Sequence, residues 1–274
     1  MKIMKGFDYR SHNIDLIHKM DDTPDQSDYV LHTHIVFQVC LLLSGKCTYH
    51  VEGNSYPMLP GDLVVTLPQE VHYIEVDPDH PCERIMLNFG PSLFFMLDPD
   101  QQLHKPFISR EPGQLNFYRA ENFKDLDFVS HFSAMTQNGK DRITIITHMM
   151  QLLKSINIAF ERSSAADSPM ETLESRIIRY INRNLRRDLS LDMLCEKFFV
   201  SKAQLYRRFK KATGTTVTKY IETKRMLCAR QMILENERII KVYTECGFQD
   251  YSTFYRAYQR YFGHSPRQER HNLN

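Results

Sequence analysis

The last hundred or so residues of the chain repeat themselves at a distance of 49 positions, and this repeat restricts the fold more than any other feature of the sequence. When this segment is shifted by 49 residues and aligned with itself, two aromatic or aliphatic positions, a tyrosine, an arginine and a glycine match. The aligned pairs are Leu205 with Phe254, Tyr206 with Tyr255, Arg207 with Arg256, Phe209 with Tyr258, and Gly214 with Gly263. Five matches at one distance predict two copies of a single structural unit.

Each copy has the pattern of two short helices joined by a tight turn. The first helix is expected at 191–198 in one copy and at 239–246 in the other, and a glycine follows each second helix, where it favours a left-handed cap. Leu205 and Phe209 lie four positions apart and share a helix face that we expect to be buried, whereas Arg207 points away from it. The pattern therefore predicts a helix-turn-helix, twice.

Helix start signals recur through this half of the chain. Ser168 followed by Pro169 predicts the start of a helix that carries Leu173, Ile177, Ile178 and Ile181 on one side. Further N-caps are predicted at Ser190, at Ser201 with Gln204 as a capping box, and at Thr216. The whole rear half is therefore expected to be helical.

Residues 36–89 follow a different period. Turn residues divide this stretch into short apolar or alternating runs about ten residues apart, which is typical of an antiparallel sandwich or barrel. From about residue 121 the period becomes helical, with a short helix expected at 123–135 and a longer one at 141–160. The predicted apolar stripe of the longer helix is Ile143, Ile146, Met150, Leu153 and Ile156. The small, polar segment 162–169 is the best linker candidate.

The net charge of +2 hides a separation of charge between the two halves. Residues 171–274 hold 21 Lys and Arg against 11 Asp and Glu, a net of +10, while residues 1–170 hold 14 against 22, a net of −8. This asymmetry indicates that the rear half, and not the front half, meets a polyanion. The longest apolar run, at 39–43, is too short to cross a membrane, and no apolar stretch follows the first lysines as in a secretory signal, so we expect a cytoplasmic protein.

The rear half resembles the DNA-binding domain of AraC-family transcription regulators. The resemblance is carried over about 100 residues by "VSKAQLYRRFKKATG", "YIETKRMLCAR" and "GFQDYSTFYRAYQRYFGHSPRQER". It implies that a long helix at 218–235 joins the two units and that both second helices contact DNA. The DNA-binding residues it implies are Lys202, Ala203, Gln204, Tyr206, Arg207 and Lys210 in the first unit, and Tyr251, Ser252, Thr253 and Arg256 in the second. Lys202 and Lys210 are expected near phosphates, and the two arginines at base edges.

Two segments of the front half resemble the sequence motifs of the cupin barrel. "LHTHIVFQVCLLLSG" contains His32 and His34, with Gln38 at the position where a metal-binding cupin keeps glutamate, and "PGDLVVTLPQEVH" ends at His72. The three histidines are weak candidates for a metal site, because the anionic ligand is missing. In AraC-type regulators such a barrel binds a small effector, and this one is similar to the sugar-responsive members. The expected effector-binding residues are His34, Gln38, Tyr49, His72 and Arg84.

The sequence thus predicts two domains: an all-β, cupin-like barrel with appended helices at 1–163, a linker at 164–170, and an all-α double helix-turn-helix at 171–274. The expected function is DNA-binding regulation of transcription in response to a small molecule, possibly a sugar, without enzymatic activity or cofactor. The expected partners are double-stranded DNA, the effector, RNA polymerase and a second copy of the chain. Two alternatives stay open: a metal-dependent cupin enzyme fused to a basic helical module, and a constitutive DNA-binding protein whose barrel only dimerises.

Overall fold

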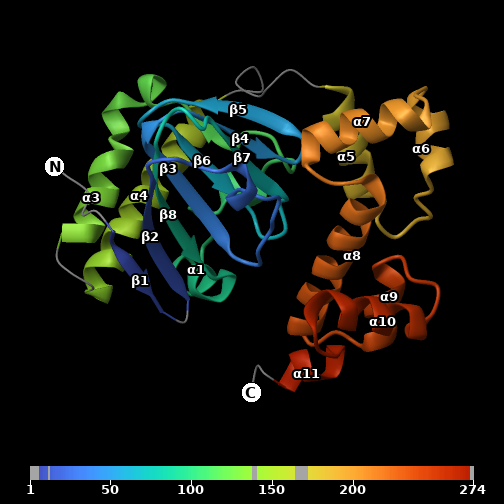
Figure 1. The fold of residues 1–274 in the computed structure, drawn as a ribbon. Helices are drawn as coiled ribbons and strands as arrows, with labels where there is room; N and C mark the ends of the chain where they lie inside the picture. The colour runs from blue at the N-terminus through green and yellow to red at the C-terminus, as the bar shows by residue number, and fades with distance from the viewer. Residues whose placement is uncertain (1–5, 12, 138–140, 164–171, 272–274) are drawn as a thin grey trace. The chain divides into compact units, whose positions relative to one another are not determined.

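The structure is a computed structural model that describes residues 6–11, 13–137, 141–163 and 172–271. The chain divides into two compact units, Met1–Glu171 and Thr172–Asn274, each with its own core (Figure 1). The expected linker at 164–170 lies outside the described residues, as does the expected cap at Ser168 and Pro169. The first helix of the rear unit instead begins at Leu173, where Thr172 caps it and forms a capping box with Ser175.

The front unit contains two antiparallel sheets, which confirms the predicted strand-rich domain. The larger sheet has the strand order β1-β2-β8-β3-β6-β9 and the smaller has the order β5-β4-β7. The strands are β1 (Asp8–Arg10), β2 (Ile14–Asp21), β3 (Phe37–Gly45), β4 (Cys47–Val51), β5 (Asn54–Met58), β6 (Leu63–Thr66), β7 (His72–Val76), β8 (Cys82–Phe89) and β9 (Phe117–Tyr118).

Both faces of the larger sheet are buried, because successive side chains of a strand point in opposite directions. On β3, Val39 and Leu41 join a core shared with the helices, whereas Cys40 and Leu42 join a core shared with the smaller sheet. Figure 1 shows α3 and α4 on one side of the larger sheet and β4, β5 and β7 on the other. The face between the two sheets is the interior that holds the expected effector-binding side chains.

The appended helices of the front unit are α1 (Pro91–Leu97), α2 (Lys105–Ile108), α3 (Phe128–Gln137) and α4 (Arg142–Arg162). The shorter predicted helix starts later than expected, at Phe128 rather than at 123. The preceding residues form a 3-10 turn, Lys124–Leu126, which ends at Asp127 with a left-handed φ of 39°. A non-glycine residue in that conformation interrupts the helix, so the apolar residues before it pack from a turn.

The apolar stripe predicted for α4 is partly wrong. Ile143 is 76% exposed, and the fully buried side chains are Ile145, Met149, Leu152, Leu153, Ile156 and Ala159. The buried face is therefore rotated from the predicted one in the first two turns, where Asp141 caps the helix and Ile143 falls on the outer side. By length and apolar composition α4 could cross a membrane, but this buried face packs into the core of the front unit.

The rear unit consists of helices throughout its described residues. They are α5 (Leu173–Arg183), α6 (Leu191–Phe198), α7 (Lys202–Thr213), α8 (Val217–Leu234), α9 (Ile239–Glu245), α10 (Tyr251–Phe262) and α11 (Pro266–His271). Ser190, Ser201 with Gln204, and Thr216 cap their helices as predicted. Figure 1 shows α8 running from the first helix-turn-helix, α6 and α7, to the second, α9 and α10.

Each helix-turn-helix buries the face predicted from the repeat. Leu205 and Phe209 are at most 2% exposed in the first unit, and Phe254 and Tyr258 are fully buried in the second. Gly214 and Gly263 end the two second helices with φ of 72° and 77°, the left-handed conformation that a glycine adopts without strain. The 18 residues of α8 span about 27 Å at about 1.5 Å per residue.

Candidate DNA-reading surface and effector site

The second helix of each unit, α7 or α10, is called here a recognition helix. Its outer surface is largely exposed, as a surface that enters a DNA groove must be. The expected DNA-binding residues that are exposed are Lys202, Ala203, Gln204, Tyr206, Arg207, Lys210, Tyr251, Ser252, Thr253 and Arg256. The structure therefore brings each of the two sets together on one helix surface.

The arginines of the recognition helices fall into two kinds. Arg208 is tied to Glu174 on α5, with its Nε 2.5 Å from the carboxylate, and Arg260 pairs with Glu222 on α8. Among the described residues, by contrast, no carboxylate lies within ion-pair distance of Arg207 or Arg256. Two arginines thus fasten the recognition helices to the helices behind them, and two exposed guanidinium groups remain available for an outside acceptor.

Several other predicted contacts have local partners. The Lys202 ammonium lies 2.6 Å from the Asp192 carboxylate, and this hydrogen bond raises the pKa of Lys202. The Gln204 side chain accepts a hydrogen bond from the backbone N–H of Ser201, and the Thr253 hydroxyl donates to Asp250, the N-cap of α10. These side chains stabilise the starts of the helices whether or not they also contact DNA.

A cleft of about 610 Å³ lies within the rear unit, between the two helix-turn-helix units. Leu191 at the start of α6, Glu222 of α8 and Phe248 of the second turn line it, together with Thr253 and Arg256 of α10. Two of the expected base-reading residues of the second helix-turn-helix, Thr253 and Arg256, therefore border this cleft.

Four of the five expected effector-binding residues lie together inside the barrel. The Tyr49 hydroxyl donates a hydrogen bond of 2.8 Å to the Gln38 side-chain oxygen. The Tyr49 ring also stacks on His72, with ring centroids 5.8 Å apart, and the His72 ring lies 4.9 Å from that of His34. This cluster comes from β3, β4 and β7 and from the segment before β3, which explains why residues far apart in sequence meet.

Two further polar residues extend this cluster and were not predicted. The Gln38 amide donates a hydrogen bond of 2.9 Å to the side-chain oxygen of Asn88, which lies opposite it on β8. Thr66 lies opposite Gln38 on β6 and is fully buried, and its hydroxyl has no hydrogen-bond partner among the residues that the structure describes. Thr66 ends the otherwise apolar run of β6, and this is the sequence signal that could have revealed it, whereas Asn88 shares its face of β8 with Arg84 and has no such signal.

Arg84, the fifth expected residue, interacts with a different set of side chains. Its guanidinium donates to the Tyr29 hydroxyl at 2.9 Å and to the Asp21 carboxylate at 3.3 Å, and it lies over the Tyr29 ring. It also contacts the Cys82 sulfur. Arg84 thus fastens the segment after β2 to the barrel, which is a structural role that the sequence pattern did not reveal.

The expected metal candidates do lie near one another. The ring centroid of His72 is 4.4 Å from that of His32 and 4.9 Å from that of His34. However, within the four described stretches no group of three or more His, Cys, Asp and Glu side chains is arranged to hold a metal ion. Burial lowers the pKa of His34 to about 4, with a further contribution from His32, and burial likewise holds the pKa of His72 well below its usual range. Both imidazoles are therefore neutral at pH 7.

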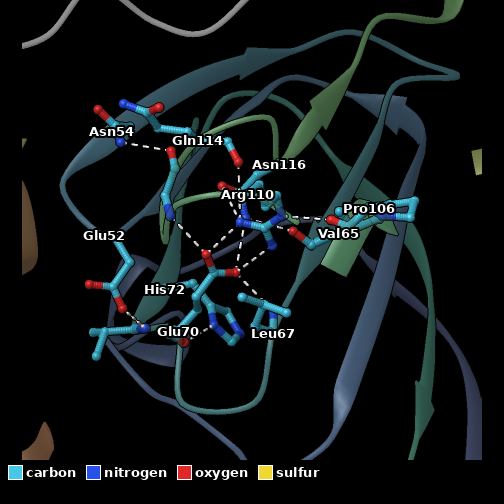
Figure 2. A network of polar contacts seen from close by, with 12 residues as sticks. Glu52, Asn54, Val65, Leu67, Glu70, His72, Pro106, Arg110, Gln114 and Asn116 are labelled. Carbon is cyan, nitrogen blue, oxygen red and sulfur yellow. Dashed lines mark hydrogen bonds and ion pairs between the residues drawn. The ribbon is translucent and has the colours of Figure 1, made fainter. Parts of the chain in front are cut away.

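A buried ion pair lies next to this cluster and was also missed. Figure 2 shows the Glu70 carboxylate facing the Arg110 guanidinium, with contacts of 2.7 and 2.9 Å. The same carboxylate accepts hydrogen bonds from the backbone of Leu67 and Gly113 and from Asn116. Burial raises the pKa of Glu70, but the charge and hydrogen bonds of Arg110 outweigh that effect, so its net pKa is lowered. This pair fixes the loop that carries His72.

Comparisons with known proteins agree with the order of the two units along the chain. Residues 18–153 match the model of the AraC-like ligand binding domain, and residues 194–272 match that of a helix-turn-helix domain. The chain is 24% identical over 240 residues to XylDLEGF operon transcriptional activator 1 of Pseudomonas putida, covering 84% of this chain and 71% of the relative. It is 23% identical over 263 residues to the HTH-type transcriptional activator RhaR of Escherichia coli O139:H28, covering 91% and 90%.

Similar solved structures include the C-terminal domain of AraT, a response regulator from Geobacillus stearothermophilus, with 25% identity and a TM-score of 0.37 over 38% of this chain and 88% of that one. ToxT from Vibrio cholerae O395 matches with 11% identity and a TM-score of 0.36 over 96% and 100%. The two matching family models occupy the barrel and the double helix-turn-helix, and the curated relatives are transcriptional activators. The chain therefore belongs to the AraC family of DNA-binding transcription regulators, with an effector-binding domain in front of its helix-turn-helix domain.

Proposed function

We propose that the rear unit reads two short clusters of bases, one with each recognition helix, about one turn of DNA apart. The observation that supports this most is that Arg207 and Arg256 are exposed at equivalent positions of α7 and α10, where no carboxylate of the described residues lies within ion-pair distance. An arginine can donate two hydrogen bonds to the O6 and N7 atoms of guanine, which makes it a specific reader in the major groove. The roughly 27 Å length of α8 suits two helices placed in successive major grooves about 34 Å apart.

The other residues of the recognition helices have supporting roles in this proposal. The Lys210 ammonium lies 5.6 Å from the centre of the Tyr206 ring and would reach a phosphate from there. Lys202 would bind a phosphate in place of its present partner, the Asp192 carboxylate. Ala203, Gln204, Tyr206, Tyr251, Ser252 and Thr253 would complete the contact surface. Phosphate contacts position the protein on the duplex, and base contacts give specificity.

The barrel interior is the proposed effector site, and a hydroxyl-rich molecule such as a sugar is the proposed class. Gln38, Tyr49, His34 and His72 supply hydrogen-bonding groups within an apolar shell, a composition suited to a small polar ligand. Arg84 would act indirectly, because its partners are Tyr29 and Asp21. The protein is proposed to act in the cytoplasm, together with RNA polymerase.

The proposed assembly is a homodimer that uses the outer face of α4. Ile143 is exposed on that face, whereas Ile146 and Met150 are half-buried against the core of the front unit, and Leu153 and Ile156 are buried within it. Two-fold dimers are the commonest soluble oligomers. Light scattering of the full chain at tens of micromolar tests this directly: a dimer that becomes a monomer in Ile143→Asp supports the interface, and a monomeric wild type contradicts it.

Selection of random DNA by the full chain tests the proposed function. We expect the selected sequences to share two base clusters whose centres lie about one helical turn of DNA apart. A single cluster would contradict the proposal that both helix-turn-helix units read bases. A reporter driven by the selected sequence should respond to an effector, and His34→Ala or His72→Ala should remove that response while DNA binding persists. If His34→Ala or His72→Ala instead weakens DNA binding equally with and without effector, this would count against separate roles for the front and rear units.

A further inference from the structure

The tautomers of His34 and His72 are fixed by the backbone. His34 Nδ1 lies 2.8 Å from the carbonyl oxygen of Val36, and His72 Nδ1 lies 2.9 Å from that of Glu70. A carbonyl oxygen can only accept a hydrogen bond, so each Nδ1 must carry the proton and donate it. In a neutral ring the opposite nitrogen, Nε2, then has a free lone pair and can only accept.

Both Nε2 atoms are buried inside the barrel, and within the described part of the chain neither has a hydrogen-bond partner. The hydroxyl of Thr66 on the neighbouring wall is also buried and unpartnered. Leaving a buried polar atom without a hydrogen bond is costly, and such atoms are rare in folded proteins, so three of them near one cluster form an unusual concentration. The cost would be recovered by a bound molecule that places donors opposite the two ring nitrogens.

The groups around the His34 and His72 rings keep both rings neutral. Burial and His32 disfavour protonation of both rings. The Tyr49 ring stacks on His72, and the Tyr49 hydroxyl donates a hydrogen bond to the neutral amide of Gln38. The Val36 carbonyl, the Gln38 side chain and, more weakly, Glu70 favour protonation of His34, but burial and His32 outweigh them, and the net pKa of His34 is lowered. The pair therefore offers lone pairs to a ligand, and a carboxylate or phosphate placed there would meet lone pairs with its own.

We propose that His34 Nε2 and His72 Nε2 together accept two hydrogen bonds from an uncharged part of the effector, such as two hydroxyl groups of a sugar ring. Sugar acids and sugar phosphates could not place their anionic group at this pair. The inference rests on the effector site proposed above and narrows its ligand class from any hydroxyl-rich molecule to neutral hydrogen-bond donors. It also assigns Thr66 to the site, because its hydroxyl can donate to or accept from the same ligand.

The protonation pattern can be measured without knowing the effector. Long-range proton–nitrogen NMR spectra of the full chain, labelled with nitrogen-15 in histidine and recorded at pH 7, should show His34 and His72 with a protonated Nδ1 and an unprotonated Nε2. His34→Gln and His72→Gln spectra supply the assignments. Either ring found with a proton on Nε2, or as an imidazolium, would overturn the proposal.

The ligand class is tested by calorimetric titration of the full chain with neutral aldoses, with the matching aldonic acids and with the matching aldose phosphates. We expect a neutral member to bind, and about tenfold weaker binding in His72→Leu, the change that corresponds to one hydrogen bond of about 1.4 kcal/mol. His72→Gln keeps an acceptor and should lie closer to the wild type, while Thr66→Val probes the third orphaned group. Tighter binding of the acid or the phosphate overturns the inference.

Two further outcomes separate this inference from the broader proposal. If no neutral aldose binds while the DNA selection still finds two base clusters, then the ligand class is wrong and the DNA-reading proposal stands. If zinc chloride added to the labelled protein shifts both Nε2 signals at micromolar concentration, then the pair is a metal site and not a hydroxyl acceptor. We expect zinc to leave both signals unchanged.

Discussion

The two helix-turn-helix units share a fold but differ in how their turns are built. In the first unit, the left-handed position that ends α6 is held by Phe199, with φ of 54° and 94% of its surface exposed. In the second, the left-handed position after α9 is Gly247, with φ of 76°. A Cβ atom there would lie 2.4 Å from the carbonyl oxygen of Leu185 and 2.8 Å from the Arg225 guanidinium.

This difference shows where packing constrains the repeat. The second turn is pressed against the segment that joins α5 to α6, so nothing larger than glycine fits at that position. The first turn faces outward, so a large side chain is accommodated there at the cost of backbone strain alone. What both helix-turn-helix units keep is the buried pair of aromatic or aliphatic side chains on the second helix and an exposed arginine, Arg207 or Arg256.

The largest expected effect comes from removing a core ring of the second unit. Phe254 is fully buried and packs against Phe248 and Tyr258, with ring centroids 5.5 and 5.6 Å away. Phe254→Ala should lower the free energy of unfolding by about 3–5 kcal/mol, because it removes apolar contact and leaves a cavity. Denaturant titration measures this, with Tyr255→Ala on the outer side as the matched control. Equal losses in the two variants would contradict the assignment of the buried face.

The turns should respond in opposite directions to substitution. Gly247→Ala forces a side chain into the contact with Leu185 and should destabilise by about 1–3 kcal/mol. Phe199→Gly relieves the left-handed strain and should stabilise by about 0.5–1 kcal/mol after the entropy cost of glycine. Thermal or denaturant unfolding of the Gly247→Ala and Phe199→Gly variants measures both effects. If Phe199→Gly is destabilising, the exposed Phe199 ring has a partner that stabilises the fold.

The smallest expected effect concerns the ion pair behind α10. Burial raises the pKa of Glu222, but the hydrogen bond and charge of Arg260, together with Lys219, outweigh that effect and lower the net pKa. A lowered folded-state pKa gives stability that is present above the unfolded value of about 4.5 and is lost as the pH falls through the folded value. Glu222→Gln should thus cost about 0.2–1 kcal/mol at pH 7 and less at pH 3, because the carboxylate loses this advantage as it is protonated.

The corresponding pair in the first unit, Glu174 with Arg208, provides the comparison. Unfolding titrations of Glu174→Gln and Glu222→Gln at pH 7 and pH 3 should give similar, pH-dependent differences from the wild type. A difference that stays constant between the two pH values would show that neither carboxylate is stabilised by its arginine.

Local signals in the sequence were sufficient to predict most of the helical unit. Ser190, Ser201 with Gln204, and Thr216 are caps whose side chains act within three residues, and Gly214 and Gly263 act at single positions. Such features can be found in a sequence because their partners are adjacent. The start predicted at Ser168 lies outside the described residues, and α5 begins at Leu173 with Thr172 as its cap.

The barrel interior was harder to predict because its contacts join distant residues. Glu70 and Arg110 are 40 residues apart, and nothing near either one indicates its partner. Arg84 was expected at the effector site, but it contacts Tyr29 and Asp21, and these contacts depend on a segment with no repetitive pattern. Ile143 was misassigned because an apolar residue in the first turn of a helix satisfies the period and yet lies beyond the edge of the core.

Selection of random DNA by Arg207→Ala and Arg256→Ala variants of the full chain tests the central claim most directly, with Lys210→Ala as the control. We predict that each arginine variant loses base preference in a different cluster, at a cost of about 1–3 kcal/mol for each lost bidentate contact. Lys210→Ala should weaken all sequences alike and lower the salt dependence by about one unit, because a phosphate contact carries no sequence information. If both arginine variants lose affinity uniformly and keep the wild-type base preferences, the two guanidinium groups bind the backbone and the account of DNA reading is wrong.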